Sequence, residues 1–344
     1  NSYDGVAKEC IAVRERVGLL DLTCFAKYEI GGSDAESFLQ RICANHIPRR
    51  EGGVALVHML TDLGGIECEA TITRIEENKY YVLSGAVAEI HDHDWLVQHI
   101  LPDEKVSVRN VTNEYGVLVL AGPRSRDVLS KLTDADLSNA AFPWLRGKTI
   151  DVSGIKTLAL RVSYAGELGW ELHIPMQNVA ELYERLMDTG AEFGIENFGT
   201  YAMNSLRMEK AYKGWGSELT TEITPIEAGL ERFVDFSKPF IGREATLSRK
   251  LLGINTKLVY LEVDADDTDC LGNEPVLNGE QIIGVTTSGS YGHSVRKSLA
   301  FAYVHPQYAD SGTNFEIRIL GQKRSATVLE EAAYDPQNLR LKNV

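Results

Sequence analysis

The last third of the sequence consists of short apolar runs separated by turn residues, and few folds accommodate that pattern. Asn278-Gly279 supplies residues that suit a type I′ turn, in which both central residues take a positive φ. Leu320-Gly321 is a weaker signal of the same kind. Six strands within about 80 residues predict a small β-barrel. The expected strands are Leu258–Val263, Glu274–Leu277, Gln281–Thr287, Ser298–Tyr303, Asn314–Ile319 and Gln322–Val328.

The preceding part of the chain mixes strands and helices in an irregular order, which predicts an α+β architecture and not a doubly wound sheet. No G-x-G-x-x-G segment follows a strand and opens a helix, so we expect no dinucleotide fold. A boundary with the barrel is expected near residues 247–256. The expected elements are strands at Lys27–Ile30, Ala55–Leu60, Cys68–Arg74, Lys79–Leu83, Val106–Val111 and Gly116–Leu120, and helices at Val87–Ile100, near Asn178–Gly194 and at Thr200–Tyr212.

A further helix is expected directly after the first of these strands. Ser33 and Glu36 have the spacing of a capping box, in which each side chain bonds a free backbone N–H of the first turn. Phe38, Leu39 and Ile42 supply the apolar stripe of this helix.

Residues 163–175 predict a β-hairpin that carries polar groups. The alternating runs Leu158–Val162 and Leu168–Ile174 flank a tight turn that contains two glycines. Tyr164, Glu167 and Glu171 place a phenol and two carboxylates on this corner. A carboxylate on a strand can bind a planar ring with adjacent N–H donors, such as a pterin, a guanine or an amidine. From the local residues alone, an edge hairpin whose acids face water is the simpler alternative.

The charge and hydropathy of the chain exclude some functions. A net charge of −14 argues against binding to nucleic acid or to an anionic membrane, although it leaves room for an anionic cofactor. No apolar run reaches the roughly 18 residues that a transmembrane helix needs. We therefore expect neither a nucleic-acid partner nor a membrane partner.

The cysteines and histidines do not predict a metal site. The five cysteines include no C-x-x-C pair, so we expect free buried thiols in a reducing compartment. His91-Asp92-His93-Asp94 comes closest to a metal cluster, but residues two apart on a helix do not share a face. We expect this segment to be a solvated helix face.

Motifs along the whole chain resemble, in the same order, those of tetrahydrofolate-binding aminomethyltransferases, the family of the glycine cleavage T-protein. Two tryptophan-containing segments and a third near residue 290 are more similar to the folate domains of dimethylglycine and sarcosine dehydrogenases than to the free-standing T-protein. The motifs are residues 12–21, Met59-Leu60 with Gly64-Gly65-Ile66, Ala121–Ser125, residues 163–175, Ser205–Gly216, Thr224–Leu230, Phe240–Glu244 and Thr286–Ser294.

This resemblance implies a three-domain cloverleaf with folate in a central funnel. Residues 1–250 would form the folate-binding region as two interleaved α+β units, one of them at approximately 50–140. Residues 251–344 would form the C-terminal β-barrel.

The resemblance also implies an activity. The chain would capture the one-carbon unit of an N-methylated amine of the dimethylglycine or sarcosine type on tetrahydrofolate, giving methylene-tetrahydrofolate. A separate flavin domain performs the oxidation in such dehydrogenases, so a flavin-containing oxidase domain or subunit is an expected partner. A lipoyl carrier is less expected, because Leu56 stands where the T-protein often has Tyr. The expected location is the bacterial cytoplasm or the mitochondrial matrix.

Two alternative functions stay open at this point. The chain could be a folate-dependent demethylase of a sulfonium or O-methyl substrate, giving 5-methyl-tetrahydrofolate. It could also be a non-catalytic folate-binding or regulatory module.

The resemblance assigns the catalytic carboxylate to Glu69. Most family members have Asp at the matching position after the Gly-Gly turn, and Glu keeps the charge but reaches one methylene further. Without the resemblance, Glu69 reads as a polar residue that faces outward from a strand.

Three polar residues match the family's folate pocket. Tyr164 matches a tyrosine near N10 of folate, which implies a catalytic as well as a binding role. Glu171 matches the carboxylate that binds the pterin amino group, and Arg207 matches an arginine that faces the pocket. Their alternatives are turn packing for Tyr164, a surface acid opposite a cross-strand base for Glu171, and an ion pair with Glu209 or Glu171 for Arg207.

Three further residues are candidates for contact with the cofactor. Gly85 lies where the family chain passes close to the pterin, although a plain strand end is the alternative. Trp215 and Tyr291 are expected to wall the pocket or to pack in the core.

Overall fold

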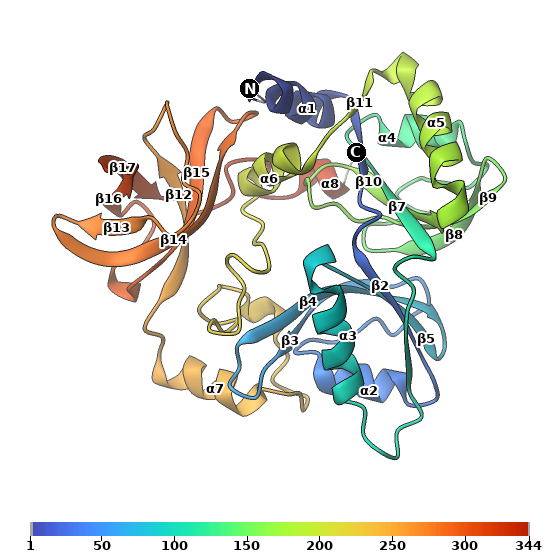
Figure 1. Cartoon of the computed structure of the whole chain (residues 1–344), viewed down its shortest axis with the longest axis horizontal. Helices are drawn as coiled ribbons and strands as arrows, with labels where there is room; N and C mark the ends of the chain where they lie inside the picture. The colour runs from blue at the N-terminus through green and yellow to red at the C-terminus, as the bar shows by residue number, and fades with distance from the viewer. Residues whose placement is uncertain (1–2, 343–344) are drawn as a thin grey trace.

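The computed structural model describes residues 3–342 and shows three lobes (Figure 1). A five-stranded sheet and a six-stranded sheet with their helices form two lobes, and a closed six-stranded barrel forms the third. The expected α+β cloverleaf with a C-terminal barrel is confirmed. The α-helices are α1 (Tyr3–Glu15), α2 (Ala35–Ile42), α3 (Glu89–Gln98), α4 (Ser125–Ser130), α5 (Val179–Gly190), α6 (Thr200–Glu209), α7 (Arg243–Leu252) and α8 (Leu339–Lys342).

The five-stranded sheet has one apolar and one polar face. Cys68, Ala70 and Ile72 of β4 lie in a core with α2 and α3. Because side chains alternate along a strand, Glu69 and Thr71 point to the opposite face. The strands are β2 (Ala26–Gly31), β3 (Val54–Leu60), β4 (Ile66–Glu76), β5 (Lys79–Ser84) and β6 (Ser107–Asn110), in the order β3-β4-β5-β2-β6.

The six-stranded sheet also has one apolar and one polar face. Trp170 and Leu172 of β10 pack in a core with α4 and α5, whereas Glu171 and His173 point away from it. The hydroxyl of Tyr81 in β5 lies 3.1 Å from Nδ1 of His173, so the two sheets meet through polar side chains. The strands are β1 (Val17–Asp21), β7 (Tyr115–Ala121), β8 (Gly147–Val152), β9 (Ile155–Leu160), β10 (Gly169–Pro175) and β11 (Ile195–Asn197), in the order β11-β1-β7-β10-β9-β8.

The barrel closes around an apolar core of its own. Its first predicted hairpin exists, but the loop is Gly279-Glu280 and only Gly279 has a positive φ, as in a type II′ turn. The second loop, Leu320-Gly321, has positive φ at both residues, as a type I′ turn requires. The strands are β12 (Lys257–Val263), β13 (Pro275–Asn278), β14 (Gln281–Gly292), β15 (Lys297–Val304), β16 (Asn314–Ile319) and β17 (Gln322–Val328).

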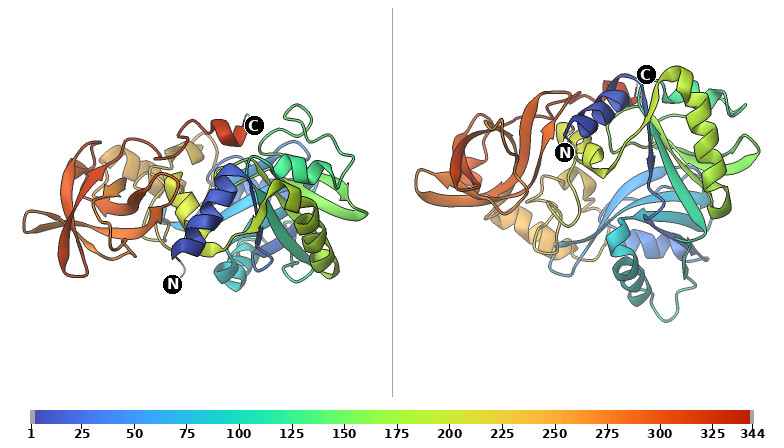
Figure 2. Two further views of the ribbon diagram at one scale, coloured as in Figure 1. Left: turned by 90° about the horizontal axis from the view of Figure 1, so that it is seen from above. Right: turned by 45° about the horizontal axis from the view of Figure 1, so that its top comes forward.

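Two helices lie side by side between the barrel and the six-stranded sheet (Figure 2). Cys10 and Val13 of α1 share a core with Ala202 and Leu206 of α6. The other side of α6 contacts β14 of the barrel. This helix therefore connects the barrel to the rest of the molecule.

Two local predictions were wrong. The capping box does not form, because Asp34 is the N-cap residue of α2 and Glu36 pairs with Arg74 at 2.9 Å instead. β9 and β10 do pair, but residues 161–168 connect them in place of a tight turn. Their hairpin does not lie at an edge either, because β10 runs between β7 and β9.

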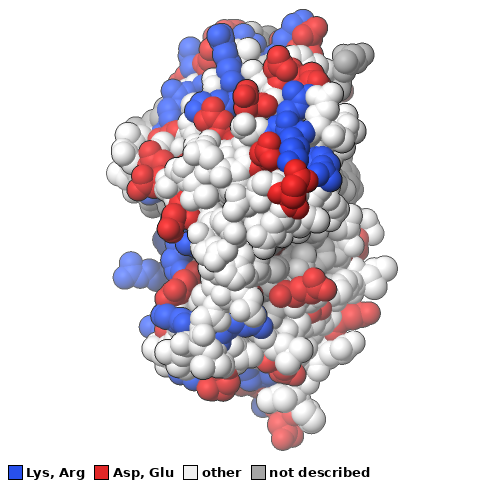
Figure 3. Space-filling view, turned by 90° about the vertical axis from the view of Figure 1, so that its left-hand side faces the viewer, with Lys and Arg blue, Asp and Glu red and all other residues white. Residues whose placement is uncertain are grey.

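The surface shows charges of both signs. On the barrel side, acidic and basic side chains intermix around an uncharged area (Figure 3). No helix within residues 3–342 has the length and apolar content needed to cross a bilayer.

All five cysteines are free thiols. Burial raises the pKa of the Cys10, Cys43 and Cys270 thiols to about 12. Cys24 departs from the prediction of buried thiols, because it is exposed.

Candidate functional site

Tyr164 lies in the connection between β9 and β10, beside the segment that follows α6. Its hydroxyl donates to the backbone carbonyl of Lys213 at 2.9 Å. Its ring stacks on that of Tyr212, with centroids 5.9 Å apart. Tyr164 is nevertheless 40% exposed. The hydrogen bond to Lys213 and the stacking on Tyr212 therefore fix the phenol, and part of its ring remains accessible to a ligand.

Charged groups from three parts of the chain act on Tyr164. Burial raises the pKa of its hydroxyl, the guanidinium of Arg207 lowers it, and the carboxylates of Glu69 and Glu218 raise it further. The fold thus brings Tyr164, Arg207 and Glu69 into one electrostatic neighbourhood. These three were predicted site residues.

Glu69 is held by a histidine of the neighbouring strand. Cross-strand pairing of β3 and β4 places it opposite His58, and its Oε2 lies 2.8 Å from Nε2 of His58. Its side chain is 20% exposed. No described residue donates a hydrogen bond to its other oxygen, Oε1, which is available to a ligand.

Glu171 is an acceptor with an incomplete set of partners. Its side chain is 14% exposed, and Oε2 lies 3.4 Å from Nε2 of His173 without forming a hydrogen bond. This buried oxygen has no hydrogen-bond partner within residues 3–342. A buried carboxylate oxygen without a donor is costly, so the geometry suits a ligand that brings N–H groups.

Arg207 pairs with neither of the acids that the sequence suggested. Its Nη1 lies 3.1 Å from Oε2 of Glu218, and Nη2 donates to Ser288 at 3.0 Å. Glu209 pairs instead with Arg14 at 2.8 Å. Arg207 is therefore tied into a buried network and orients the surrounding groups.

Lys213 brings a second cation to this neighbourhood. Burial and then the charge of Arg232 lower the pKa of its ammonium group, while Glu218 and Glu69 raise it. The ammonium nitrogen lies 5.7 Å from the centroid of the Phe301 ring. It forms no ion pair with any residue in the described part of the chain.

Gly85 and Trp215 lie close to β4. Ala70 of β4 pairs with Ser84, which places Gly85 next to Glu69 along the strand register. A Cβ at Gly85 would meet nothing within 4 Å, so open space adjoins this backbone. Nε1 of Trp215 donates to the carbonyl of Glu67 at 3.0 Å.

The His91–Asp94 segment is more than a solvated helix face. His91 bonds to Glu67 at 2.8 Å, and its ring lies 6.0 Å from that of Trp215. Burial would lower the pKa of His91, but the hydrogen bonds with Asp92 and Glu67 outweigh it and raise the pKa. No three His, Cys, Asp or Glu side chains within residues 3–342 form a metal-binding group.

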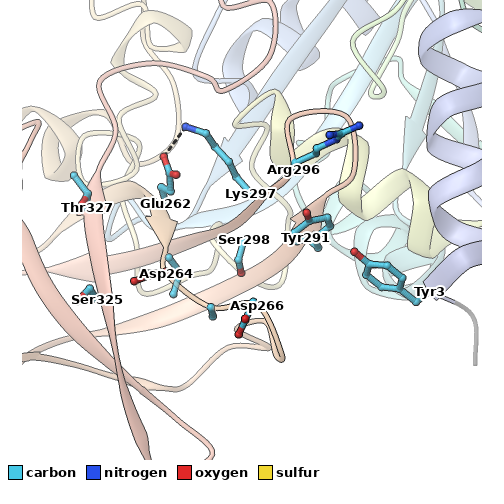
Figure 4. Close-up of a pocket in the computed structure, with 12 residues that line it drawn as sticks. Tyr3, Glu262, Asp264, Asp266, Tyr291, Arg296, Lys297, Ser298, Ser325 and Thr327 are labelled. Carbon is cyan, nitrogen blue, oxygen red and sulfur yellow. Dashed lines mark hydrogen bonds and ion pairs between the residues drawn. The ribbon is translucent and has the colours of Figure 1, made fainter.

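Tyr291 lies away from the other predicted residues. It belongs to β14 and lines a cavity of about 410 Å³ on the barrel, together with Tyr3 and Arg296 (Figure 4). Its ring lies 5.8 Å from Tyr3 and 5.2 Å from His293. The structure therefore does not place Tyr291 as a wall of the site around Tyr164.

Sequence reasoning missed His58, His173 and Glu218. The first two occupy strand positions that alternate with core residues, which was a usable signal of a polar inner face. Glu218 lies in an irregular segment, and its contacts with α6 and β14 left no local signal.

These groups are of the kinds that bind a planar, hydrogen-bonding ligand. Glu171 offers an acceptor for ring N–H donors, Tyr164 offers a partly exposed ring, and Glu69 offers a separate carboxylate for proton transfer. The cations Arg207 and Lys213 balance these acids.

Comparison with family profiles matches most of the chain. Residues 1–238 match the GCVT N-terminal domain, and residues 256–335 match the glycine cleavage T-protein C-terminal barrel domain. An aminomethyltransferase of Thermoanaerobacter sp. (strain X514) is 30% identical over 334 residues, which cover 96% of this chain and 90% of that protein.

A longer protein is more similar in sequence. The mitochondrial dimethylglycine dehydrogenase of Rattus norvegicus is 42% identical over 334 residues, 96% of this chain but only 39% of the rat protein. The chain thus spans about two fifths of the length of this relative. Among solved structures, the glycine cleavage system aminomethyltransferase T of Bartonella henselae matches with a TM-score of 0.87 at 24% identity, covering 96% of this chain and 90% of that one.

Proposed function

The chain belongs to the glycine cleavage T-protein family, and from this premise we propose that it binds tetrahydrofolate and transfers a one-carbon unit to it. The observation that carries the proposal is the buried Oε2 of Glu171, an acceptor without a donor within residues 3–342. A pterin ring presents adjacent N–H donors of the kind that this oxygen lacks. The residues present therefore fit the cofactor.

Each residue has a separate task in this proposal. Glu171 would hold the pterin edge, Tyr164 would bound the pocket through its exposed ring, and Arg207 would orient both through its network. Glu69 would move a proton or stabilise positive charge during the transfer. Bound tetrahydrofolate supplies the nitrogen atoms that accept the one-carbon unit, giving methylene-tetrahydrofolate.

The proposed donor is an N-methylated amine of the dimethylglycine or sarcosine type. The identity of 42% with a dimethylglycine dehydrogenase supports this class. Oxidation of such an amine requires a redox group, so the proposal includes a flavin-containing oxidase domain or subunit as partner. The rat relative is mitochondrial, which supports a matrix location, or the cytoplasm if the chain is bacterial.

Calorimetric titration with tetrahydrofolate under anaerobic conditions tests the binding. We expect a Kd in the micromolar range, and a clear loss of affinity in Glu171→Ala. Absence of binding by the folded chain would reject the proposal and leave a module without a folate function.

A second assay tests the transfer. The chain is mixed with tetrahydrofolate, dimethylglycine and a flavoprotein that oxidises dimethylglycine, and methylene-tetrahydrofolate formation is measured against a mixture without the chain. The proposal requires a faster rate with the chain and less released formaldehyde. Binding without acceleration would leave a folate-binding module and reject the transferase.

A further inference from the structure

His58 is a buried polar residue next to the proposed catalytic carboxylate. It lies in β3, is 0% exposed and faces Glu69 across the β3–β4 pair. Its Nε2 is 2.8 Å from Oε2 of Glu69. Its ring packs edge-on against Phe233, with centroids 5.5 Å apart.

The hydrogen bonds of His58 indicate which ring nitrogen carries the proton. Nδ1 is buried and has no hydrogen-bond partner within residues 3–342. Nε2 is the nitrogen that lies 2.8 Å from the Glu69 carboxylate, and a carboxylate only accepts hydrogen bonds. His58 therefore donates through Nε2 to Glu69.

Because of this contact, one oxygen of the Glu69 carboxylate is hydrogen-bonded and the other is not. Oε2 is fixed by His58, while Oε1 accepts no hydrogen bond from the described residues. The charge of Glu69 acts on both Tyr164 and Lys213, so the carboxylate lies toward the candidate site. Glu has one more rotatable bond than Asp, and a fixed hydrogen bond removes that added freedom.

We propose that His58 is a positioning residue for the one-carbon transfer. It holds Glu69 in the single orientation that leaves Oε1 free for the reacting groups. This inference rests on the proposed function, because it gives Glu69 the role of the assisting carboxylate. In this proposal, the hydrogen bond from His58 restricts the longer Glu side chain to an orientation that suits catalysis.

The test compares three variants in the transfer assay described above. His58→Leu removes the donor, His58→Gln keeps a side-chain N–H that can reach Glu69, and Glu69→Gln removes the charge. We expect His58→Leu to lower kcat by about 10–100-fold, since a misplaced catalytic group costs about that much, and to leave KM for tetrahydrofolate within about twofold. His58→Gln should recover most of the loss.

A matched control separates positioning from stability. Val57, the neighbouring residue of β3, is buried on the opposite, apolar face of the sheet. Val57→Ala should lower the thermal stability of the chain without changing kcat at temperatures where the variant is folded. Thermal denaturation of every variant tests whether it is folded, and titration with tetrahydrofolate tests whether it binds the cofactor.

The outcomes distinguish the two ideas. If Glu69→Gln slows the transfer but His58→Leu does not, the positioning role of His58 is overturned and the proposed function stands. If neither change slows the transfer, Glu69 is not the assisting carboxylate, and both statements fail. If His58→Gln is as slow as His58→Leu while Val57→Ala is fast, the hydrogen bond is not what His58 contributes, and the proposal is rejected.

Discussion

At the scale of single residues, two glutamates in the two different sheets have different environments. Glu69 has one oxygen fixed by His58, whereas Glu171 keeps a buried oxygen without a partner. A carboxylate with a fixed oxygen suits a chemical role, and one that lacks a donor suits a binding role. This difference could not be derived from the sequence, because both glutamates lie in strands in which apolar and polar residues alternate.

Replacement of Glu171 should therefore affect affinity. Glu171→Ala removes a charge-assisted hydrogen bond to tetrahydrofolate, so we expect binding to weaken by about 1.5–3 kcal/mol. Calorimetric titration measures the change. Glu181→Ala, on the exposed face of α5, is a matched control that should leave the affinity unchanged. Equal affinities of the Glu171→Ala variant and the unmodified chain would remove Glu171 from the pocket.

Gly85 allows a test of close approach between backbone and ligand. Its φ of −63° and ψ of 140° suit any residue, and a Cβ there would meet no protein atom within 4 Å. Gly85→Ala should stabilise the chain by about 0.4–1 kcal/mol, because it restricts the unfolded state. If the pterin fills the adjoining space, the added methyl group should weaken tetrahydrofolate binding. Urea unfolding and calorimetry measure the two effects, and unchanged affinity would leave Gly85 as a plain strand end.

At the scale of elements, strands were more predictable than turns and caps. The six barrel strands follow from alternation and turn residues, but β14 continues to Gly292, past a register shift between Thr286 and Ser288. The expected capping box failed because the N-cap of α2 is Asp34 and not Ser33, and because Glu36 pairs with the distant Arg74. Long-range partners of this kind have no local signature in the sequence.

The carboxyl group of Glu274, directly before β13, should make the stability of the fold depend on pH. Burial would raise the pKa of the Glu274 carboxyl, but hydrogen bonds from Thr286 and from the N–H groups of Leu271 and Gly272 outweigh burial and lower the pKa below 4.5. A lowered folded-state pKa stabilises the fold above the unfolded-state pKa, and this contribution is lost as pH falls through the folded value.

Glu274→Gln should remove this contribution. We expect the variant to be about 1–3 kcal/mol less stable than the unmodified chain at pH 7, because neutral amide contacts replace charge-assisted ones. The difference should narrow as the pH falls through the lowered folded-state pKa of Glu274, because the carboxyl is then protonated in the folded chain as well. Urea unfolding at several pH values measures it, and a difference that does not vary with pH would contradict the argument.

At the scale of the whole molecule, Glu218 joins the lobes. Its carboxylate is buried and accepts hydrogen bonds from Arg207 of α6 and from Thr287 and Ser288 of β14. Tyr303 of β15 donates to its backbone carbonyl at 2.7 Å. A buried charge network next to the candidate site thus contributes to the docking of the barrel.

Loss of this carboxylate should be costly. Glu218→Ala leaves the buried guanidinium of Arg207 unpaired, and we expect a loss of about 3–5 kcal/mol in the free energy of unfolding. Glu218→Ala combined with Arg207→Met should cost less than the sum of the single changes. Glu231→Ala, which removes an exposed ion pair with Lys250, should cost about 1 kcal/mol or less. Strictly additive effects would show that the pair does not act as a unit.

The candidate site was only partly predictable at this scale. Tyr164, Arg207 and Glu69 come together as motif matching suggested, because each lies in a segment that the shared fold positions. Tyr291 matched a motif equally well but faces the outer cavity of the barrel. A motif predicts which strand carries a residue. The face of the sheet to which the side chain points depends on the strand register, and the bulge in β14 alters that register.

The order of strands in the six-stranded sheet also has a consequence for synthesis of the chain. Val17 of β1 pairs with Ile195 of β11, about 180 residues later, and ribosomes would need roughly 10–40 s to supply that partner. Every strand of the five-stranded sheet lies between β1 and β7, so this inserted unit can fold first on the ribosome. Its folding would bring the two ends of the insertion together and shorten the loop that β1 and β7 must close. β1 would therefore stay unpaired until the five-stranded unit, which the chain inserts between β1 and β7, has been made.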